Sequence, residues 1–407
     1  MNLRRVVDYD VLVLTALLWF LGKFLRYAFP PLFEPLQASY GVSNAAVGTA
    51  FTGFMLVYAL MQFPSGALAD RIGAVRVIAG GASVAGLGAL AVVFDAPFLV
   101  LAAIMLVIGG GTGAHKTVAV RLLSRVYPAR TGRALGAHDT FGAFGGVVAP
   151  AAVVVFLAAP PAFDAVLSRL PGADWRGLFL LTGVVALGLV AVFVRRVPGR
   201  LPANADRGNG RGRTPGLREY ASLFRDPRLT AFVFVTVAFS FAYNGTVAFL
   251  PLYLSQTGGL STATANLLYS ALFAVTFVQL VSGDLSDRLG RFPVMVVTLG
   301  LGAAALVGVV LLAGSGAVVL GALVVALGLG SHGFRPVRGA YLVEALPDRL
   351  AGGGLGVIRT LLMGAGALAP SIVGVGADLV GFRAAFGVLA VSMGSAAVLA
   401  AVLWVTE

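Results

Sequence analysis

The sequence predicts an all-α membrane protein with twelve transmembrane helices, and three observations lead to that prediction. Of the 407 residues, 58% are hydrophobic and 11% are charged, whereas soluble domains carry about 25% charged residues. The hydrophobic residues gather in long, uniformly apolar runs, and one crossing of a bilayer needs roughly 20 such residues. Arginines concentrate in every second loop between these runs. Strands are not expected, because a membrane barrel shows short segments of alternating hydrophobicity.

Twelve apolar runs are expected to form the helices, with short loops between most of them. Their approximate limits are 10–33, 44–66, 75–94, 97–122, 133–158, 177–195, 229–254, 262–283, 293–313, 316–342, 352–377 and 382–404. Glycine is abundant at 54 residues, as expected where membrane helices approach closely without a hydrophobic drive between them.

The net charge of +12 comes mainly from loop arginines. These are Arg4, Arg5, Arg71, Arg76, Arg125, Arg130, Arg133, the arginines of 195–228, Arg288, Arg291 and Arg349. Loops rich in Arg and Lys mark the cytoplasmic side, so we expect both termini in the cytoplasm of a multi-pass protein of the cell membrane. The positive charge of these loops is then explained by their position beside the lipid bilayer, so no nucleic acid partner is expected. The first run has no small-residue cleavage site after it, so it is interpreted as a span and not as a signal peptide.

Two similar halves flank a polar segment. Residues 197–228 are rich in Arg, Pro and Gly, which is typical of a flexible linker. It separates an expected six-helix bundle at 1–196 from a second at 229–407. Three short patterns recur between the halves: Ala28–Phe33 and Ala248–Tyr253, Gly66–Val77 and Gly283–Val294, and Ala149–Pro150 and Ala369–Pro370. The distance along the chain between the copies is nearly the same for all three. It indicates a duplicated unit, an arrangement that occurs in secondary transporters with the site between repeats.

One of these patterns carries a family resemblance. GALADRIG at Gly66–Gly73, with Arg76 after it, resembles the signature loop between helices 2 and 3 of the major facilitator superfamily (MFS), and GDLSDRLGR at Gly283–Arg291 is similar to it. The resemblance implies the MFS fold, with two six-helix bundles related by a pseudo-two-fold axis. It also implies that both loops gate the transporter by latching the cytoplasmic ends of the bundles. The implied gating residues are Gly66, Asp70, Arg71, Gly73, Arg76, Gly283, Asp287, Arg288, Gly290 and Arg291. Sharp turns are expected at Gly66 and Gly73, and Asp70 is expected to cap a helix or pair with an arginine.

Helices 5 and 11 also resemble the glycine-rich segment of that family. The matching residues are Gly136, Gly142, Gly145, Gly146 and Pro150, then Gly356, Gly364, Gly366 and Pro370. In some members this feature accompanies export. An arginine that the family carries in helix 4 is replaced here by Val107, so a proton-coupling scheme built on that arginine does not transfer.

Charged residues inside the expected spans are the main functional candidates, because such groups are costly in a bilayer. Lys23 and Arg26 are close in sequence and share a helix face. The others are Lys116, Asp139, Arg335 and Arg359, each roughly 12–17 Å from its cytoplasmic helix end at about 1.5 Å per residue. The spacing from Lys116 to Arg335, and from Asp139 to Arg359, is close to the spacing of the repeated patterns. We therefore expect each pair at equivalent places in the two halves.

The four residues at this depth form one layer of the expected membrane domain, and this layer has more cations than anions. Lys116 and Asp139 can neutralise each other, but Arg335 and Arg359 have no acid nearby in the sequence. An anionic substrate would relieve that cost, because arginine binds carboxylate and phosphate groups through two parallel hydrogen bonds. Competing interpretations are that these arginines only bond to backbone carbonyls, that Lys116 reaches the cytoplasmic surface, that Lys23 and Arg26 reach toward Glu34, and that Asp139 is a structural partner. Arg121 and Arg338 lie closer to the cytoplasm and are expected to reach it.

Secondary candidates for the cavity are Tyr27, His115, His138, Tyr243 and Asn244. His138 can titrate near neutral pH, but adjacent helix residues do not share a face, so at most one of His138 and Asp139 points into a cavity. Tyr243 and Asn244 precede Gly245 and Pro251, where a helix can break and line a site.

Two transport hypotheses follow. The first is a secondary transporter that moves a small organic or inorganic anion by alternating access, alone or with H⁺ or another coupling ion. The second is a proton-coupled exporter of drugs or metabolites that uses Asp139. An enzyme is not expected, because no catalytic constellation is visible, and neither a cofactor nor a metal is expected. The chain has no cysteine and no phosphate-binding loop of the ATPase type. We expect a monomer.

Overall fold

The computed structural model describes residues 9–158, 165, 169, 174–201, 221–347 and 351–406. Twelve helical segments within these residues are long and apolar enough to cross a bilayer, which confirms the predicted number, and these residues contain no strand. Most of the expected linker lies outside the described residues, as do Arg4, Arg5 and Arg349.

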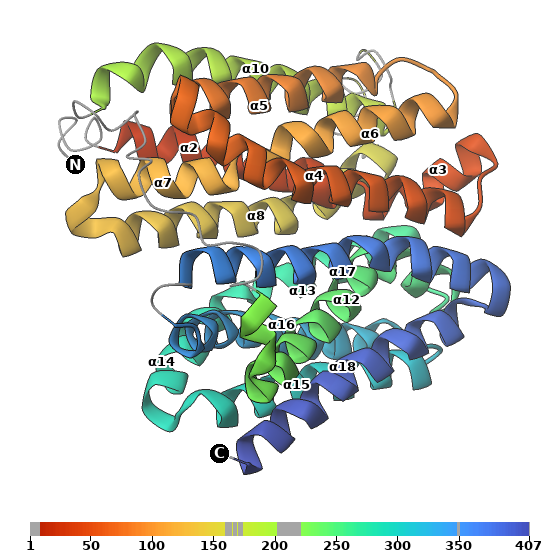
Figure 1. Ribbon diagram of the computed structural model, residues 1–407. Coiled ribbons are helices and arrows are strands. Elements are labelled where there is room, and N and C mark those ends of the chain that lie inside the picture. The colour runs from red at the N-terminus through yellow and green to blue at the C-terminus, as the bar shows by residue number, and fades with distance from the viewer. Residues whose placement is uncertain are drawn as a thin grey trace. The chain divides into compact units, whose positions relative to one another are not determined.

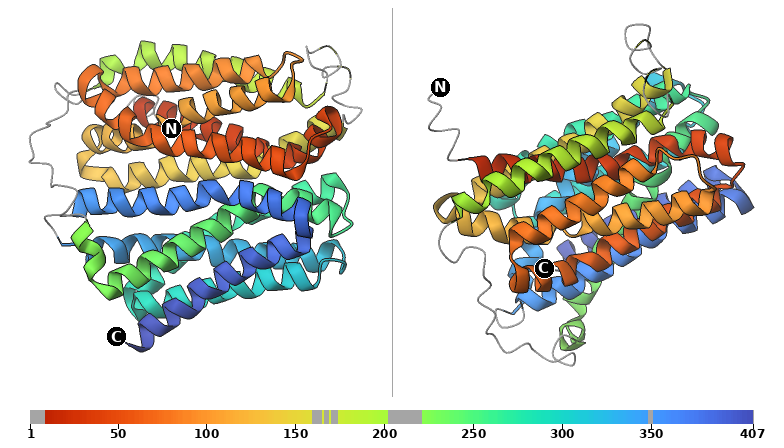
Figure 2. Two further views of the ribbon diagram at one scale, coloured as in Figure 1. Left: turned by 45° about the vertical axis from the view of Figure 1, so that its right-hand side comes forward. Right: turned by 90° about the horizontal axis from the view of Figure 1, so that it is seen from above.

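The chain divides into two compact units, and each is described here by itself. The first unit comprises Met1–Pro35 and Gly53–Arg211, and the second comprises Leu36–Thr52 and Gly212–Glu407. In Figure 1 the helices of each unit run side by side, and the two views of Figure 2 show the same arrangement within each unit.

The first unit is built from the helices that begin the chain, together with most of α4. In chain order these elements are α2 (Asp10–Ala28), η1 (Pro30–Leu32), the part of α4 (Asn44–Ile72) from Gly53 onward, α5 (Ala74–Ala91), α6 (Phe98–Gly113), α7 (Lys116–Val126), η2 (Pro128–Arg130), α8 (Thr131–Ala158), α10 (Arg176–Arg196) and η3 (Pro198–Arg200). Apolar side chains of α2, α5, α7 and α10 form one of its buried clusters, which includes Leu14, Ile78, Leu122 and Phe193.

The second unit contains the remaining elements. These are most of α3 (Phe33–Tyr40), the start of α4, η4 (Ser222–Arg225), α12 (Pro227–Gln256), α13 (Thr262–Ala274), η5 (Val275–Phe277), α14 (Val278–Leu289), α15 (Arg291–Leu311), α16 (Ala317–Ala345), α17 (Ala351–Val380) and α18 (Phe382–Val405). Pro251 lies inside α12, and the helix continues through it. The break that the sequence suggested near this proline is therefore absent.

The fourth predicted span is interrupted where the sequence places its glycines. The helix α6 ends at Gly113, and α7 starts at Lys116, with a turn at Ala114 and His115 between them. Glycine weakens a helix because it loses more backbone freedom than other residues do. The interruption puts His115 and Lys116 at the start of a new helix, which determines the direction in which their side chains leave the backbone.

The two signature loops turn at their second glycine only. Gly73 has φ 95° and Gly290 has φ 94°, a backbone conformation that favours glycine. Gly66 and Gly283 instead lie inside α4 and α14, so the expected turn at Gly66 is wrong. A glycine lowers helix stability without ending a helix by itself, and α4 therefore continues to Ile72, directly before the positive φ of Gly73.

The packing of α8 on α2 depends on glycine. A Cβ on Gly145 would lie 2.7 Å from the carbonyl oxygen of Phe20 and 2.9 Å from the Cβ of Lys23. A Cβ on Gly142 would overlap the indole nitrogen of Trp19. These two glycines meet the expectation of close contact in helix 5, whereas nothing lies within 4 Å of the position a Cβ would take on Gly136, Gly356 or Gly364.

The start of α4, Asn44–Thr52, belongs to the second unit, and Asp378 of α17 contacts it there. The carboxylate of Asp378 accepts hydrogen bonds from the backbone N–H groups of Asn44 (3.2 Å) and Ala45 (2.8 Å) and from the Asn44 side chain (2.8 Å). The first N–H groups of a helix have no partner within the helix, and a carboxylate there is favoured by the helix dipole. Asp378 therefore caps α4 from a helix that is remote in the sequence.

Candidate functional site

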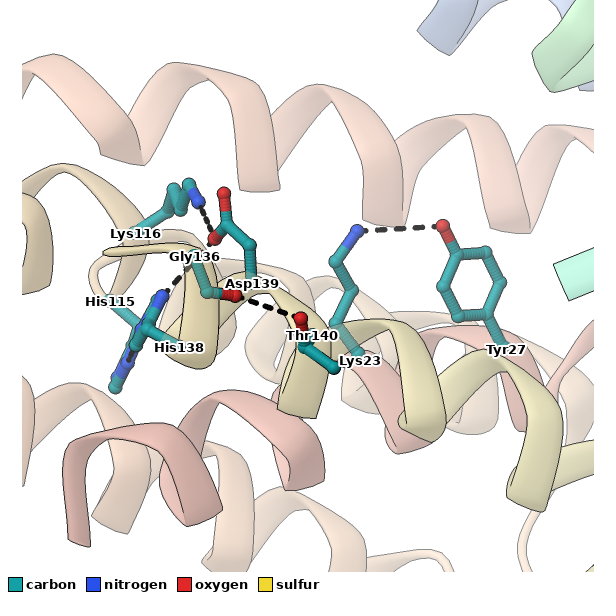
Figure 3. A network of polar contacts seen from close by, with 8 residues as sticks. All are labelled: Lys23, Tyr27, His115, Lys116, Gly136, His138, Asp139 and Thr140. Carbon is teal, nitrogen blue, oxygen red and sulfur yellow. Dashed lines mark hydrogen bonds and ion pairs between the residues drawn. The ribbon is translucent and has the colours of Figure 1, made fainter. Parts of the chain in front are cut away.

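A cluster of polar residues lies inside the first unit, where α2, α7 and α8 meet. Figure 3 shows Lys116 and Asp139 pointing toward each other, with His115 and His138 below them in this view. The ammonium group of Lys116 donates to Oδ1 of Asp139. Asp139 is the more exposed partner, at 57% of its side chain against 17% for Lys116. The pairing that the sequence suggested is therefore present, with its carboxylate open to the surroundings.

The two histidines form the buried part of this cluster. Their Nε2 atoms lie 3.3 Å apart, and Nδ1 of His138 lies 3.2 Å from Oδ1 of Asp139. His138 is fully buried while Asp139 is exposed, as expected for neighbours on a helix that do not share a face. The indole ring of Trp19 stacks on both imidazoles, at centroid distances of 5.6 and 5.7 Å.

Lys23 and Arg26 both contact Tyr27 on α2. Lys23 Nζ lies 5.2 Å from the centre of the Tyr27 ring and 3.4 Å from its hydroxyl, and it also lies 5.1 Å from the ring of Trp19. The guanidinium of Arg26 is 5.5 Å from Tyr27 and 5.4 Å from Tyr58 on α4. An aromatic face stabilises a cation by about 0.5–2 kcal/mol, so these rings make the cations on α2 less costly.

Arginines dominate the corresponding region of the second unit. The guanidinium of Arg335 on α16 lies 4.3 Å from the ring centre of Tyr243. Arg338, one turn further along α16, lies 5.8 and 5.9 Å from the rings of Phe239 and Phe334. Arg335 and Arg359 are close enough to Arg338 for electrostatic repulsion. We call Arg335, Arg338 and Arg359 the arginine cluster.

The acids that the structure describes in the second unit all have partners outside this cluster. Asp226 caps α12, Asp284 pairs with Arg288, Asp287 and Glu344 pair with Arg291, and Asp378 caps α4. Among the described residues, no acid forms an ion pair with the arginine cluster. The excess of cations that the sequence indicated for Arg335 and Arg359 therefore extends to Arg338.

His332 accompanies this cluster in a defined state. Its Nε2 faces the backbone carbonyl of Leu272 at 3.1 Å, and its Nδ1 lies 3.5 Å from Nη1 of Arg335. A carbonyl accepts and a guanidinium donates, so the imidazole carries its proton on Nε2 and accepts on Nδ1. His332 is therefore neutral and helps to hold Arg335 over Tyr243.

Asn244 serves packing between α12 and α17. Its amide donates to the carbonyl of Ser240 at 2.8 Å, and the Ser240 hydroxyl donates to the carbonyl of Leu362 at 2.5 Å. A Cβ on Gly366 would lie 2.5 Å from the Asn244 amide nitrogen. The structure thus places this candidate in a helix–helix contact.

Each signature loop holds its aspartate in a different ion pair. Asp70 lies 3.2 Å from Arg121 on α7, and no side chain caps α5 at Gly73. Asp287 pairs with Arg291, which also lies 2.7 Å from Glu344 on α16. Arg71 and Arg76 line an apolar groove of about 850 Å³ between α4, α5 and α6.

A short sequence repeat gives an alignment of the two halves that differs from the one based on the charged residues. Gly111–His115 reads GTGAH and Gly328–His332 reads GLGSH, and aligning these two segments pairs the remaining residues of both helices. In this register Arg121 matches Arg338, while Lys116 matches Gly333 and not Arg335. The short GxGxH repeat was the sequence signal for the second histidine and for Arg338, which sequence reasoning assigned to the cytoplasmic surface.

The twelve apolar helices of spanning length among the described residues define a multi-pass integral membrane protein. The Major Facilitator Superfamily model matches residues 13–327, and the chain belongs to that family. This membership places it among transport proteins and not among enzymes.

The matched relatives differ in what their names say they carry. The probable sulfoacetate transporter SauU of Cupriavidus necator is 26% identical over 71% of this chain and 65% of its own length. The glycine betaine/proline/ectoine/pipecolic acid transporter OusA of Dickeya dadantii is 28% identical over 67% of this chain and 57% of its own length. Multidrug resistance protein D of Escherichia coli is 24% identical over 66% of this chain and 63% of its own length. The chain thus matches less than two thirds of the length of each of these relatives.

Solved structures share the fold across nearly the whole chain. A bacterial homologue of the human lysosomal transporter Spinster, in an inward-facing and occupied conformation, gives a TM-score of 0.79 at 18% identity, covering 98% of this chain and 97% of that one. A mutant of the nucleoside transporter NupG gives 0.75 at 14% identity, covering 98% and 99%. At these identities the likeness establishes the fold alone.

Proposed function

We propose that the protein is a secondary transporter of a small anion, and that the arginine cluster binds the substrate. The observation that carries this proposal is the presence of Arg335, Arg338 and Arg359 together, while the described acids of their unit are engaged elsewhere. Arg335 and Arg338 are half-buried and Arg359 is exposed, and cations that partly leave water without a counter-ion are costly. An anion that binds between them removes that cost.

The arrangement of the guanidinium groups suits anion binding. Arg335 stacks on Tyr243 at 4.3 Å, and a stacked guanidinium keeps its N–H groups available at its edge. Two such edges can bind a carboxylate, sulfonate or phosphate through parallel hydrogen bonds. The neutral His332 contacts the same Arg335, so it orients this side chain without adding positive charge.

One relative supports this substrate class. SauU is named as a probable sulfoacetate transporter, and sulfoacetate carries a sulfonate and a carboxylate. The names of the other two relatives point to zwitterionic solutes and drugs. Sulfoacetate is therefore a suitable first probe within a wider panel of anions.

The test is uptake by the purified protein in proteoliposomes, with phosphate, sulfate, sulfoacetate, lactate and succinate as probes. We expect wild-type protein to exchange at least one of them, and Arg335→Gln and Arg359→Gln to lose most of that exchange. Arg225→Gln is the matched control, because Arg225 is exposed at the end of η4 and belongs to neither the arginine cluster nor the gating loops. Equal exchange in wild type and in both cluster variants would show that the substrate binds elsewhere.

A proton-coupled exporter that uses Asp139 is the second candidate. It is favoured by the exposed Asp139 carboxylate, which contacts both Lys116 and His138. Drug or metabolite resistance on expression, abolished by Asp139→Asn, would support it. Resistance that persists in Asp139→Asn would remove Asp139 as the proton site.

The remaining assignments complete the proposal. Residues 1–196 and 229–407 act as two bundles joined by 197–228, the termini are cytoplasmic, and the protein works as a monomer in the bilayer. Asp70, Arg71 and Arg76, with Asp287, Arg288 and Arg291, form the gating loops. Labelling of a single cysteine introduced within 202–220, by a reagent that does not cross the membrane, tests the orientation.

A further inference from the structure

The two arginines of α16 lie over different aromatic rings of α12. The guanidinium of Arg335 lies 4.3 Å from the centre of the Tyr243 ring, and the guanidinium of Arg338 lies 5.8 Å from the centre of the Phe239 ring. The centres of these rings are 5.8 Å apart, and the rings are inclined by only 17°. Both rings are buried, so each guanidinium has a fixed support of its own.

The spacing along α16 keeps these two guanidinium groups apart. Residues three apart on a helix share a face and are separated by about 4.5 Å along its axis. Arg335 is restrained further because Nδ1 of His332 lies 3.5 Å from its Nη1. The ring of Phe334 lies 5.9 Å from the guanidinium of Arg338. Bringing both guanidinium groups onto one small acid group would therefore cost contacts that the structure contains.

The charge of the arginine cluster exceeds what a monoanion can neutralise. Arg335, Arg338 and Arg359 each carry one positive charge, and the described acids of the second unit pair with other groups. A monoanion leaves two of these charges uncompensated, whereas a dianion leaves one. Because uncompensated cations that partly leave water are costly, the cluster favours the ligand with the larger negative charge.

The edges of the guanidinium groups determine how such a ligand is held. An aromatic ring that covers one face of a guanidinium leaves the N–H groups at its edge available. One such edge binds one carboxylate or sulfonate through parallel hydrogen bonds. Two guanidinium groups on separate supports therefore offer two positions for acid groups, about one helical turn apart.

We propose that the substrate is a small dianion with two separate acid groups, one bound to Arg335 and the other to Arg338. This assignment rests on the proposed function and divides its anion site into two positions. Arg359 adds positive charge beside Arg338, so the cluster keeps one net positive charge after the dianion binds. Succinate and sulfoacetate belong to this class, whereas lactate has one acid group and sulfate carries both charges on one group.

The experiment compares two competitors of the same size for inhibition of anion exchange by the purified protein in proteoliposomes. The exchanged anion is whichever of phosphate, sulfate, sulfoacetate, lactate and succinate the wild-type protein transports. Succinate has two carboxylates that are both ionised at neutral pH, and succinamate has an uncharged amide in place of one of them. We expect succinate to inhibit at a concentration at least about 10-fold lower, because only succinate forms hydrogen bonds between charged groups at both positions.

Arg338→Gln removes one of the two positions. It should raise the inhibitory concentration of succinate at least about 10-fold and leave that of succinamate nearly unchanged, so that the two competitors become equal. Inhibition by succinamate also shows that the variant is folded, because the Arg335 position still holds one carboxylate. Arg225→Gln is the matched control: Arg225 is exposed at the end of η4, and its loss should preserve the difference between the competitors.

Two results would overturn the two-position site while leaving an anion site in place. Equal inhibition by succinate and succinamate in wild-type protein would mean that one acid group is sufficient for binding. Stronger inhibition by sulfate than by succinate and sulfoacetate would mean that both charges act on a single position. Exchange of none of the five anions would instead remove the proposed function, and the two-position site with it. The wild-type comparison needs no variant, so it decides the question even if Arg338→Gln does not fold.

Discussion

The polar cluster of the first unit and the arginine cluster of the second occupy related places in a duplicated sequence but have opposite electrostatic character. In the first, Lys116 is neutralised by Asp139, and histidines complete the network. In the second, Arg359 stands where the Ala-Pro repeat of the two halves aligns it with Asp139, and aromatic rings surround the cations. The duplication thus supplied one scaffold in which one copy carries a lysine–acid pair with histidines and the other carries a cluster of arginines.

The largest effect is expected when the second unit is given the acid of the first. Arg359→Asp reverses a charge beside Arg338 and supplies an internal counter-ion. One unit charge at about 5 Å contributes on the order of 3 kcal/mol at an effective dielectric constant of 20, so anion exchange should fall at least about 100-fold. Exchange rates in proteoliposomes measure it. Arg225→Asp is the control for a surface charge reversal, and undiminished exchange in Arg359→Asp would contradict the assignment.

Arg121 and Arg338 provide the next comparison, since they match in the GxGxH register. Arg338→Gln removes one donor of the cluster and should weaken anion affinity about 10-fold or more, because a hydrogen bond to a charged group contributes about 1.5–3 kcal/mol. Arg121 pairs with Asp70, so Arg121→Gln should leave the affinity of the site for the anion nearly unchanged. Titration of the anion into each purified variant separates the two, and equal losses would contradict the distinction.

The packing of α2 on α8 gives a stability comparison between two glycines of one helix. Gly142→Ala forces a methyl group into Trp19 and should destabilise the protein by about 1–3 kcal/mol. Gly136→Ala places its methyl in open space and should be neutral or stabilising by up to about 1 kcal/mol. Denaturant unfolding in detergent followed by tryptophan fluorescence measures both. A neutral Gly142→Ala would mean that Trp19 can move aside freely.

The smallest effect is expected at the signature loop of the first unit. Asp70 and Arg121 are both about half exposed, and exposed ion pairs contribute about 0–1 kcal/mol. Asp70→Asn should therefore change the unfolding free energy by less than about 1 kcal/mol. A larger loss in the same unfolding assay would assign the loop a structural role beyond its ion pair.

Hydropathy and repeats were sufficient to predict the number of helices, because each span must satisfy its own backbone hydrogen bonds in lipid. They also suggested the Lys116–Asp139 pair, since depth can be counted along a helix. Counting residues along a helix does not tell which neighbouring helix a side chain faces, so these contacts could not be predicted in the same way. Arg338 was therefore assigned to the cytoplasmic surface. In the structure its guanidinium instead lies near the rings of Phe239 and Phe334, within the arginine cluster.

The histidine pair escaped prediction for a related reason. His115 leaves a turn between two helices, and the sequence did not indicate that α6 would stop at Gly113. Its distance of 3.3 Å from His138 depends on that interruption and on the close approach of α8 to α2. Similarly, the cap that Asp378 forms on α4 depends on tertiary contacts for which no local sequence pattern exists.

The most direct measurement of the central claim is calorimetric binding of the exchanged anion to purified wild-type protein, Arg335→Gln and Arg225→Gln. The account predicts binding to wild type and Arg225→Gln with the same affinity, and at least about 10-fold weaker binding to Arg335→Gln. Equal affinity in all three proteins would contradict it.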